Sequence, residues 1–150
     1  MGQSLVKNYL DLVSSTKHRQ PLIYAPVEEE LHRYLGGICN QLECQVIQVG
    51  GYTDHIHILC MLSKKIALVK LMEELKSHSS KWIKTKGEQY ENFYWQDGYG
   101  AFSVNPSEAD TVINYIANQH NHHKQKTFQD EYRAFLNKYE VAYDERYVWD

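Results

Sequence analysis

The sequence predicts an α+β protein in which helices cover one face of a largely antiparallel sheet. Two short segments, 44–49 and 54–62, have the composition of strands and flank Gly50-Gly51, which predicts a hairpin. Several longer segments carry apolar residues at the spacing of a helix with one buried side. These observations predict the element order β-α-β-β-α-β-α-α, and the sequence contains no Gly-rich phosphate-binding loop.

The first half of the chain opens with an alternating segment, 5–13, that predicts a strand. The alternation puts Asp11 and Val13 on one face of the sheet and Leu12 on the other. Pro26 then begins a predicted helix, because proline fits the first turn and the glutamates that follow suit the positive end of the helix dipole. This helix leads into the predicted hairpin.

The second half of the chain is predicted to be mainly helical. Apolar spacing predicts a helix over 66–85, and a segment rich in aromatic residues and glycine, 88–103, predicts a loop leading into a strand. The segment Asn105–Glu108 has the composition of a turn and an N-cap, which opens a helix to about His122. A last helix is predicted over 128–139.

Length and composition favour one globular domain, 1–150, in a reducing, cytoplasmic environment. A chain of 150 residues can bury a core without disulfides or metals. Its three cysteines form no CxxC pattern, which indicates free thiols. The longest apolar run, Ile58–Leu62, is far too short to span a bilayer, so we expect no membrane association.

The formal charge of −3 conceals a basic segment. Between Lys64 and Lys86, seven lysines and two glutamates give a local charge of +5. Lys70, Lys81 and Lys84 lie on the polar side of the predicted helix. Such a side is usually only solvated, but the aromatic segment that follows it would also suit an unpaired nucleic-acid strand.

His55 and His57 are the first candidates for chemistry. Side chains two residues apart on a strand share a face, with Cα atoms about 6.6–6.8 Å apart, so both imidazoles can reach one divalent cation. Ile56 and Ile58 would then point into the core. The alternative is that both histidines are ordinary polar residues on a strand.

Tyr115 and Gln119 are the second candidates. Four residues apart on one predicted helix, they share a side at the edge of its apolar stripe, where a side chain can face a cleft. The alternative is a half-buried tyrosine beside a solvated glutamine. His122, near the end of the same predicted helix, could assist phosphate binding or only favour the negative end of the helix.

Five short segments stand out in order along nearly the whole chain: Ser15–Pro21, Asp54–Ile58 with two histidines around an apolar residue, Trp95–Val104, Tyr115–Gln119 and Tyr143–Trp149. Each motif is weak by itself, but their order is specific. Together they resemble the single-tyrosine HUH transposases of small bacterial and archaeal insertion sequences, to which the REP-associated tyrosine transposases are closely related.

This resemblance implies a ferredoxin-like α/β sandwich and a metal-dependent transposase that cleaves and joins single-stranded DNA through a covalent 5′-phosphotyrosine. Tyr115 would be the nucleophile, and His55, His57 and Gln119 would bind Mg²⁺ or Mn²⁺. The resemblance also implies single-stranded DNA with hairpin ends as the substrate. It further implies a homodimer in which the tyrosine helix of one chain can complete the histidine site of the other.

DNA contacts are expected from basic residues in several elements: Arg19, Lys70, Lys81, Lys84 and His122. Asp11 departs from the family pattern, in which histidine or an aromatic residue is common, and we expect this departure to affect only local DNA contacts. Two alternatives remain open at this stage. One is a domesticated, non-catalytic binder of structured single-stranded DNA, and the other is an unrelated metal hydrolase that uses the HxH pair.

Overall fold

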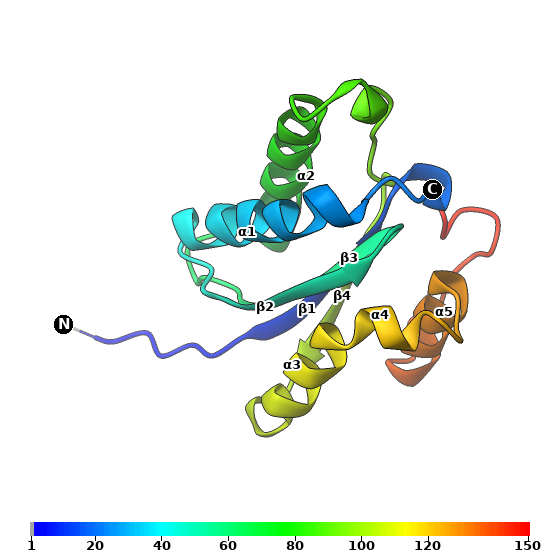
Figure 1. The fold of residues 1–150 in the computed structure, drawn as a ribbon. Helices are drawn as coiled ribbons and strands as arrows, with labels where there is room; N and C mark the ends of the chain where they lie inside the picture. The colour runs from blue at the N-terminus through cyan, green and yellow to red at the C-terminus, as the bar shows by residue number, and fades with distance from the viewer. Residues whose placement is uncertain (1) are drawn as a thin grey trace.

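A four-stranded sheet forms the centre of the computed structural model, which describes residues 2–150 (Figure 1). The sheet has the order β2-β3-β1-β4, and every neighbouring pair is antiparallel. Its strands are β1 (Tyr9–Ser15), β2 (Val46–Tyr52), β3 (His55–Met61) and β4 (Gly100–Val104). The two central strands, β1 and β3, are the most continuously buried, as expected for strands covered on both faces.

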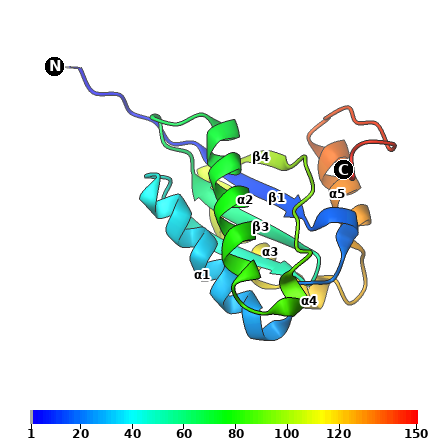
Figure 2. The ribbon, with the colours of Figure 1, turned by 90° about the horizontal axis from the view of Figure 1, so that it is seen from above.

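Two long helices cover one face of the sheet. α1 (Ala25–Gln41) connects β1 to β2, and α2 (Leu68–Lys84) connects β3 to β4. Figure 2 shows both helices crossing the same side. Each connection passes over one intervening strand, which gives the interleaved arrangement of a ferredoxin-like sandwich. The predicted α+β class is therefore confirmed, and the predicted element order holds as far as the last strand, β4.

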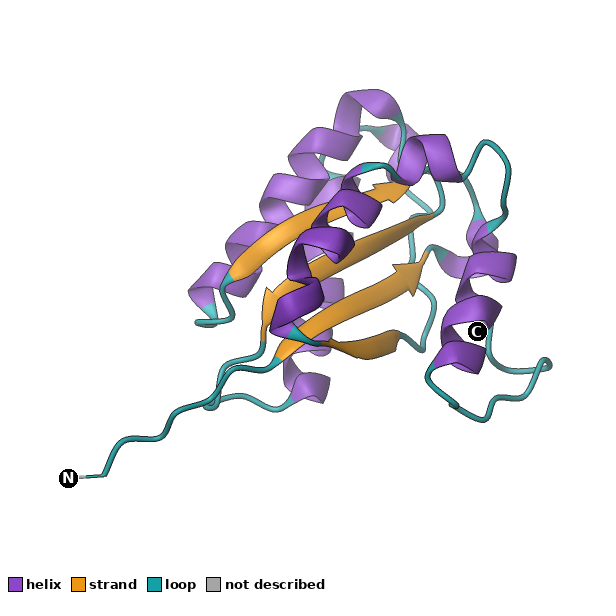
Figure 3. Cartoon of the chain, turned by 90° about the horizontal axis from the view of Figure 1, so that it is seen from below, coloured by secondary structure: helices purple, strands orange, loops and turns teal. Residues whose placement is uncertain are grey.

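Three further helices lie on the opposite face, so the expectation that helices cover only one face is wrong (Figures 1 and 3). They are α3 (Ala109–Ala117), α4 (Gln119–His122) and α5 (Phe128–Lys138). The physical reason is that this face also carries apolar side chains, among them Val13 and Leu59, which must be covered.

The larger apolar core lies between the sheet and the pair α1 and α2. β1 contributes Leu12 and β3 contributes Ile56 and Ile58, all at most 3% exposed. Leu31 from α1 and Leu71 from α2 pack in the same cluster. The predicted orientation of Ile56 and Ile58 is thus confirmed.

The hairpin turn falls later than predicted. Gly50 and Gly51 lie within β2, and the turn is formed by Thr53 and Asp54. A Cβ atom at Gly50 would clash with the carbonyl oxygen of Ile116 in α3. The first glycine therefore serves close packing of a helix on a strand rather than a turn.

β1 begins at Tyr9 rather than at residue 5, because its partners end there. Tyr9 pairs with Met61 of β3 and Val104 of β4, and β4 stops before Pro106. Leu5 is exposed, and the N-terminal segment runs away from the sheet in Figure 2.

Short 3-10 turns link the main elements at Lys17–Arg19, Glu88–Tyr90 and Pro106–Glu108. The three cysteines are free and buried. Across residues 2–150, the helices are too short or too polar to cross a membrane.

Candidate metal centre and active site

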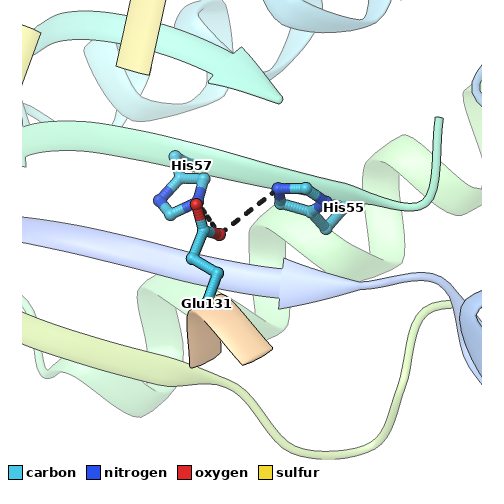
Figure 4. A group of neighbouring side chains, drawn as sticks. All are labelled: His55, His57 and Glu131. Carbon is cyan, nitrogen blue, oxygen red and sulfur yellow. Dashed lines mark hydrogen bonds and ion pairs between the residues drawn. The ribbon is translucent and has the colours of Figure 1, made fainter. Parts of the chain in front are cut away.

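His55 and His57 lie side by side on β3, on the face covered by α3, α4 and α5 (Figure 4). Their side chains are 0% exposed, and their ring centroids are 5.3 Å apart. The alternation that sends Ile56 and Ile58 into the apolar core sends both imidazoles to the other face. Such complete burial is unlike an ordinary polar strand face and requires partners for every ring nitrogen.

A carboxylate holds the outer nitrogen of each imidazole. Nδ1 of His55 donates to Oδ1 of Asp54 over 2.7 Å, and Nδ1 of His57 lies 3.2 Å from Oδ1 of Asp11. Asp11 is only 2% exposed. The expectation that this residue affects only local DNA contacts is therefore wrong, because Asp11 orients His57. Histidines that bind metals commonly have such a carboxylate behind the ring, with Nε2 turned inward.

Gln119 reaches the histidines although the helix that carries it is broken. One helix was predicted to continue to His122, but α3 ends at Ala117 and α4 begins at Gln119 after Asn118. Oε1 of Gln119 lies 2.9 Å from Nε2 of His55. The structure thus brings His55, His57 and Gln119 together.

Tyr115 lies beside the same group. Its ring centroid is 5.9 Å from that of His57, and its hydroxyl donates to Oε2 of Glu131. The close approach of α3 to Gly50 sets the distance of this helix from the sheet. Tyr115 and the two histidines of β3 therefore lie close together within one chain.

Glu131, in the first turns of α5, is the central residue that sequence analysis missed (Figure 4). It is 2% exposed. Oε1 lies 2.9 Å from Nε2 of His57 and 3.5 Å from Nε2 of His55. Oε2 accepts from Nε2 of Gln119 at 3.2 Å and lies 3.1 Å from Nε2 of His123. One carboxylate therefore joins both β3 histidines to Gln119 and Tyr115.

The sequence does contain a signal for Glu131. Phe128, Tyr132 and Leu136 form the buried stripe of α5, and Glu131 lies in the same stripe by helical spacing. A charged residue inside an apolar stripe is rarely buried without a partner. The signal identifies Glu131 as unusual, but it does not identify His57 as its partner.

The pKa shifts follow from burial and close pairing. Burial lowers the pKa of His55. Burial also opposes protonation of His57, but Asp11 and Glu131 outweigh it and raise the pKa of His57 to about 10. Burial opposes ionisation of Glu131, yet His123 and His57 hold the pKa of its carboxyl group well below its usual range. Burial and the Glu131 charge raise the pKa of the Tyr115 hydroxyl.

The donor set fits a divalent cation. His55 donates from Nδ1 to Asp54, and its lowered pKa leaves Nε2 with a lone pair. That lone pair faces two oxygens, Oε1 of Gln119 and Oε1 of Glu131, and the amide of Gln119 is oriented by its own donation to Glu131. A lone pair that faces two acceptor oxygens with no proton between them is repelled, and a cation placed there relieves the repulsion.

The predicted DNA-contact residues fall in different places. Lys70, Lys81 and Lys84 lie on α2, across the sheet from the histidines. Lys70 pairs with Glu74 at 3.0 Å, and Lys84 lies 4.2 Å from the ring centroid of Tyr94. The structure therefore does not bring these three lysines to the histidine site.

Arg19 and His122 lie nearer the histidines. Arg19 follows β1, whose last residue Ser15 pairs with His55, and its guanidinium lies over the ring of Trp149. Nε2 of His122 lies 3.3 Å from the hydroxyl oxygen of Tyr115. Their contacts with DNA stay predictions.

The fold and the site together define a class: an α+β sandwich whose central strand presents two histidines to a tyrosine on a covering helix. Residues 4–119 match the family model described as IS200-like transposase. This match covers most of the chain, so the protein belongs to the IS200-like transposase family. No protein of curated function matches the sequence.

Two solved structures share the fold. One, from Deinococcus radiodurans R1 and provisionally described as a transposase, has a TM-score of 0.61 and 20% identity, covering 79% of this chain and 96% of its own. The other is a REP-associated tyrosine transposase bound to a REP hairpin, with a TM-score of 0.60 and 13% identity. The alignment covers 82% of the present chain and 73% of the chain in that structure. At these identities the likeness concerns the fold.

Proposed function

We propose that this transposase cleaves and joins single-stranded DNA through a covalent bond between Tyr115 and a 5′-phosphate. The observation that carries the proposal is the meeting of Tyr115 with the histidine pair. The carboxylate that accepts from the Tyr115 hydroxyl also contacts Nε2 of both His55 and His57. A nucleophile beside a set of metal-binding groups is the combination that phosphoryl transfer uses.

Tyr115 supplies the attacking oxygen. A bond forms between this oxygen and the phosphorus of one phosphodiester, while the bond from phosphorus to the 3′-oxygen breaks. Tyr115 loses its proton and the departing 3′-oxygen gains one, so the products are a 5′-phosphotyrosine and a free 3′-OH. Because the new bond is again a phosphodiester, a different 3′-OH can reverse the step and join another strand without ATP.

His55, His57 and Gln119 are the residues that would hold Mg²⁺ or Mn²⁺. When bound, such a cation offsets negative charge that develops on the scissile phosphate. Asp54 and Asp11 keep Nε2 of each imidazole turned inward. The raised pKa of Tyr115 means that the phenol is protonated in the metal-free chain, so its activation depends on a compensating charge nearby.

Single-stranded DNA with hairpin ends is the substrate we propose, with the whole chain, 1–150, acting as one domain. The REP hairpin in the related structure supports a hairpin substrate. In this proposal Arg19 and His122 would contact the strand near the site, and Lys70, Lys81 and Lys84 would contact DNA farther away. A homodimer that exchanges tyrosine helices is part of this proposal, although Tyr115 already meets the histidines of its own chain.

The test is formation of a covalent adduct. The purified chain is incubated with Mn²⁺ and single-stranded oligonucleotides that carry the imperfect palindromes flanking its gene, and a mass shift is sought by denaturing electrophoresis. We expect an adduct with wild type and with Tyr147→Phe, an exposed control, and none with Tyr115→Phe. An adduct that persists in Tyr115→Phe would refute the nucleophile. Binding without cleavage by wild type would favour the non-catalytic binder.

A further inference from the structure

We propose that Glu131 is a fourth protein ligand of the metal centre, so that α5 completes a site of two histidines, one glutamine and one glutamate. The inference rests on the proposed function, which places a divalent cation at His55, His57 and Gln119. Glu131 lies beyond residues 4–119, the part of the chain that matches the family, so family membership assigns it no role.

The spacing of the donor atoms supports this assignment. Metal–oxygen bonds of about 2.1 Å place neighbouring octahedral ligands roughly 3 Å apart. Oε1 of Glu131 lies 2.9 Å from Nε2 of His57 and 3.5 Å from Nε2 of His55. Oε1 of Gln119 lies 2.9 Å from Nε2 of His55. The carboxylate oxygen therefore occupies a ligand position relative to the histidines.

The other oxygen of Glu131 is already engaged and fixes the carboxylate. Oε2 accepts from the Tyr115 hydroxyl and from Nε2 of Gln119, and His123 lies 3.1 Å away. Only Oε1 is turned toward both β3 histidines. A carboxylate held in this way needs little reorganisation to bind a cation, and it links the metal centre directly to the nucleophile.

Charge also favours a carboxylate in the ligand set. Two neutral imidazoles and an amide would leave the charge of a buried divalent cation uncompensated. Mg²⁺ and Mn²⁺ prefer oxygen ligands, carboxylates above all. Nε2 of His57 and Oε1 of Glu131 lie 2.9 Å apart, so one cation can bind both atoms.

Manganese binding by the full chain tests the inference without reference to cleavage. Mn²⁺ alone is titrated into metal-free protein, and free Mn²⁺ is followed by electron paramagnetic resonance. The variants are Glu131→Gln, which keeps the shape, and Glu131→Ala, which removes the donor. Glu140→Gln, an exposed glutamate just after α5, is the matched control. Circular dichroism without metal verifies folding of each variant.

We expect both Glu131 variants to weaken Mn²⁺ affinity by at least about 10–100-fold, the size of effect seen when even an outer partner of a metal ligand is removed. Glu140→Gln should bind like wild type. As a measurement independent of the variants, a crystal of wild type with Mn²⁺ should show anomalous density bonded to Oε1 of Glu131.

Three results would overturn the inference, and they differ in what else they affect. Unchanged affinity in Glu131→Gln and Glu131→Ala would show that the carboxylate only pairs with the histidines, and the proposed three-residue metal site would stand. Anomalous density that contacts His55 and His57 but not Glu131 would lead to the same conclusion. Wild type that binds no Mn²⁺ would overturn both this inference and the metal site of the proposed function.

Discussion

The two faces of the central sheet are built from the same strands and both bury apolar side chains, but the face under α3 to α5 also buries carboxylates and imidazoles. On the side of α1 and α2, β1 and β3 present Leu12, Ile56 and Ile58 to an apolar core. On the side of α3 to α5, the same strands present Asp11 and His57, which are buried just as deeply. One residue along a strand therefore separates a stabilising side chain from a functional one.

This small domain combines stability with chemistry by giving the two faces different buried groups. Burial of apolar groups on the first face is favourable at about 25 cal/mol per Å². Burial of charged groups on the second face is costly unless each group has a partner. Asp11, His57 and Glu131 satisfy one another, so the second face is stable only as a complete network.

The largest loss of stability is expected when one member of this network is replaced. His57→Leu leaves Asp11 and Glu131 without their shared partner and should lower the free energy of unfolding by about 3–5 kcal/mol. The triple variant Asp11→Leu, His57→Leu, Glu131→Met removes all three groups and should regain most of that loss. Urea denaturation followed by circular dichroism measures both.

A triple variant that is less stable than His57→Leu alone would show that the polar face stabilises the fold in its own right, and the contrast between the two faces would fail.

A somewhat smaller loss of stability is expected when a side chain is removed from the apolar core under α1 and α2. Ile58→Ala removes a fully buried side chain and should cost about 2–5 kcal/mol, with no partner change able to restore it. Val69→Ala, an exposed position on α2, is the control and should change stability by less than about 0.5 kcal/mol. The measurement is again urea denaturation, in metal-free buffer. Equal stabilities of the two variants would mean that this cluster does not carry the fold.

The smallest effect concerns a charge at the edge of the apolar face. Nζ of Lys76 on α2 donates to the carbonyl oxygens of Gln96 and Gly98 over 2.8 and 2.6 Å. Burial lowers the pKa of Lys76 to about 8. Between pH 8 and the usual lysine value of about 10.5, the unfolded chain binds more protons than the folded chain. The free energy of unfolding should therefore rise with pH in this window through Lys76.

Lys76→Met should remove this contribution. The free energy of unfolding of wild type, compared with that of the variant, should therefore increase by about 1 kcal/mol between pH 8 and 10. This value already allows for the partial exposure of Lys76. Lys81→Met, an exposed position on the same helix, should show no such trend. Thermal unfolding across this pH range is the measurement. A difference between wild type and Lys76→Met that does not vary with pH would contradict the lowered pKa of Lys76.

Local spacing made part of the site predictable. The two-residue period of a strand is sufficient to place His55 and His57 on one face and Ile56 and Ile58 on the other, and the structure has this arrangement. The pairing of Tyr115 with Gln119 was also local, and it survives the break at Asn118: Nε2 of Gln119 lies 3.5 Å from the carbonyl oxygen of Tyr115.

The partners of the histidines could not be found in the same way. Asp11 pairs with Leu59 across the sheet, which makes His57 its diagonal neighbour on the same face. That register depends on how β1 aligns with β3. Asp11 and His57 are 46 residues apart in the sequence, so local spacing does not indicate that they meet. The turn at Thr53 and Asp54 was likewise missed, because Gly50 is needed where α3 packs on β2 and Gly51 where the backbone of β3 passes close by.

The α+β class, the shared face of His55 and His57 and the shared helix side of Tyr115 and Gln119 could be read from side chains a few residues apart, and the family resemblance marked Tyr115 as the candidate nucleophile. Packing between elements far apart in the sequence was needed to show that helices cover both faces of the sheet and that Asp11 orients His57. It alone also brought Glu131, 74 residues from His57, to the centre of the site. The physical reason is that a periodic pattern specifies which side of an element is buried, whereas the packing of whole elements decides what that side meets.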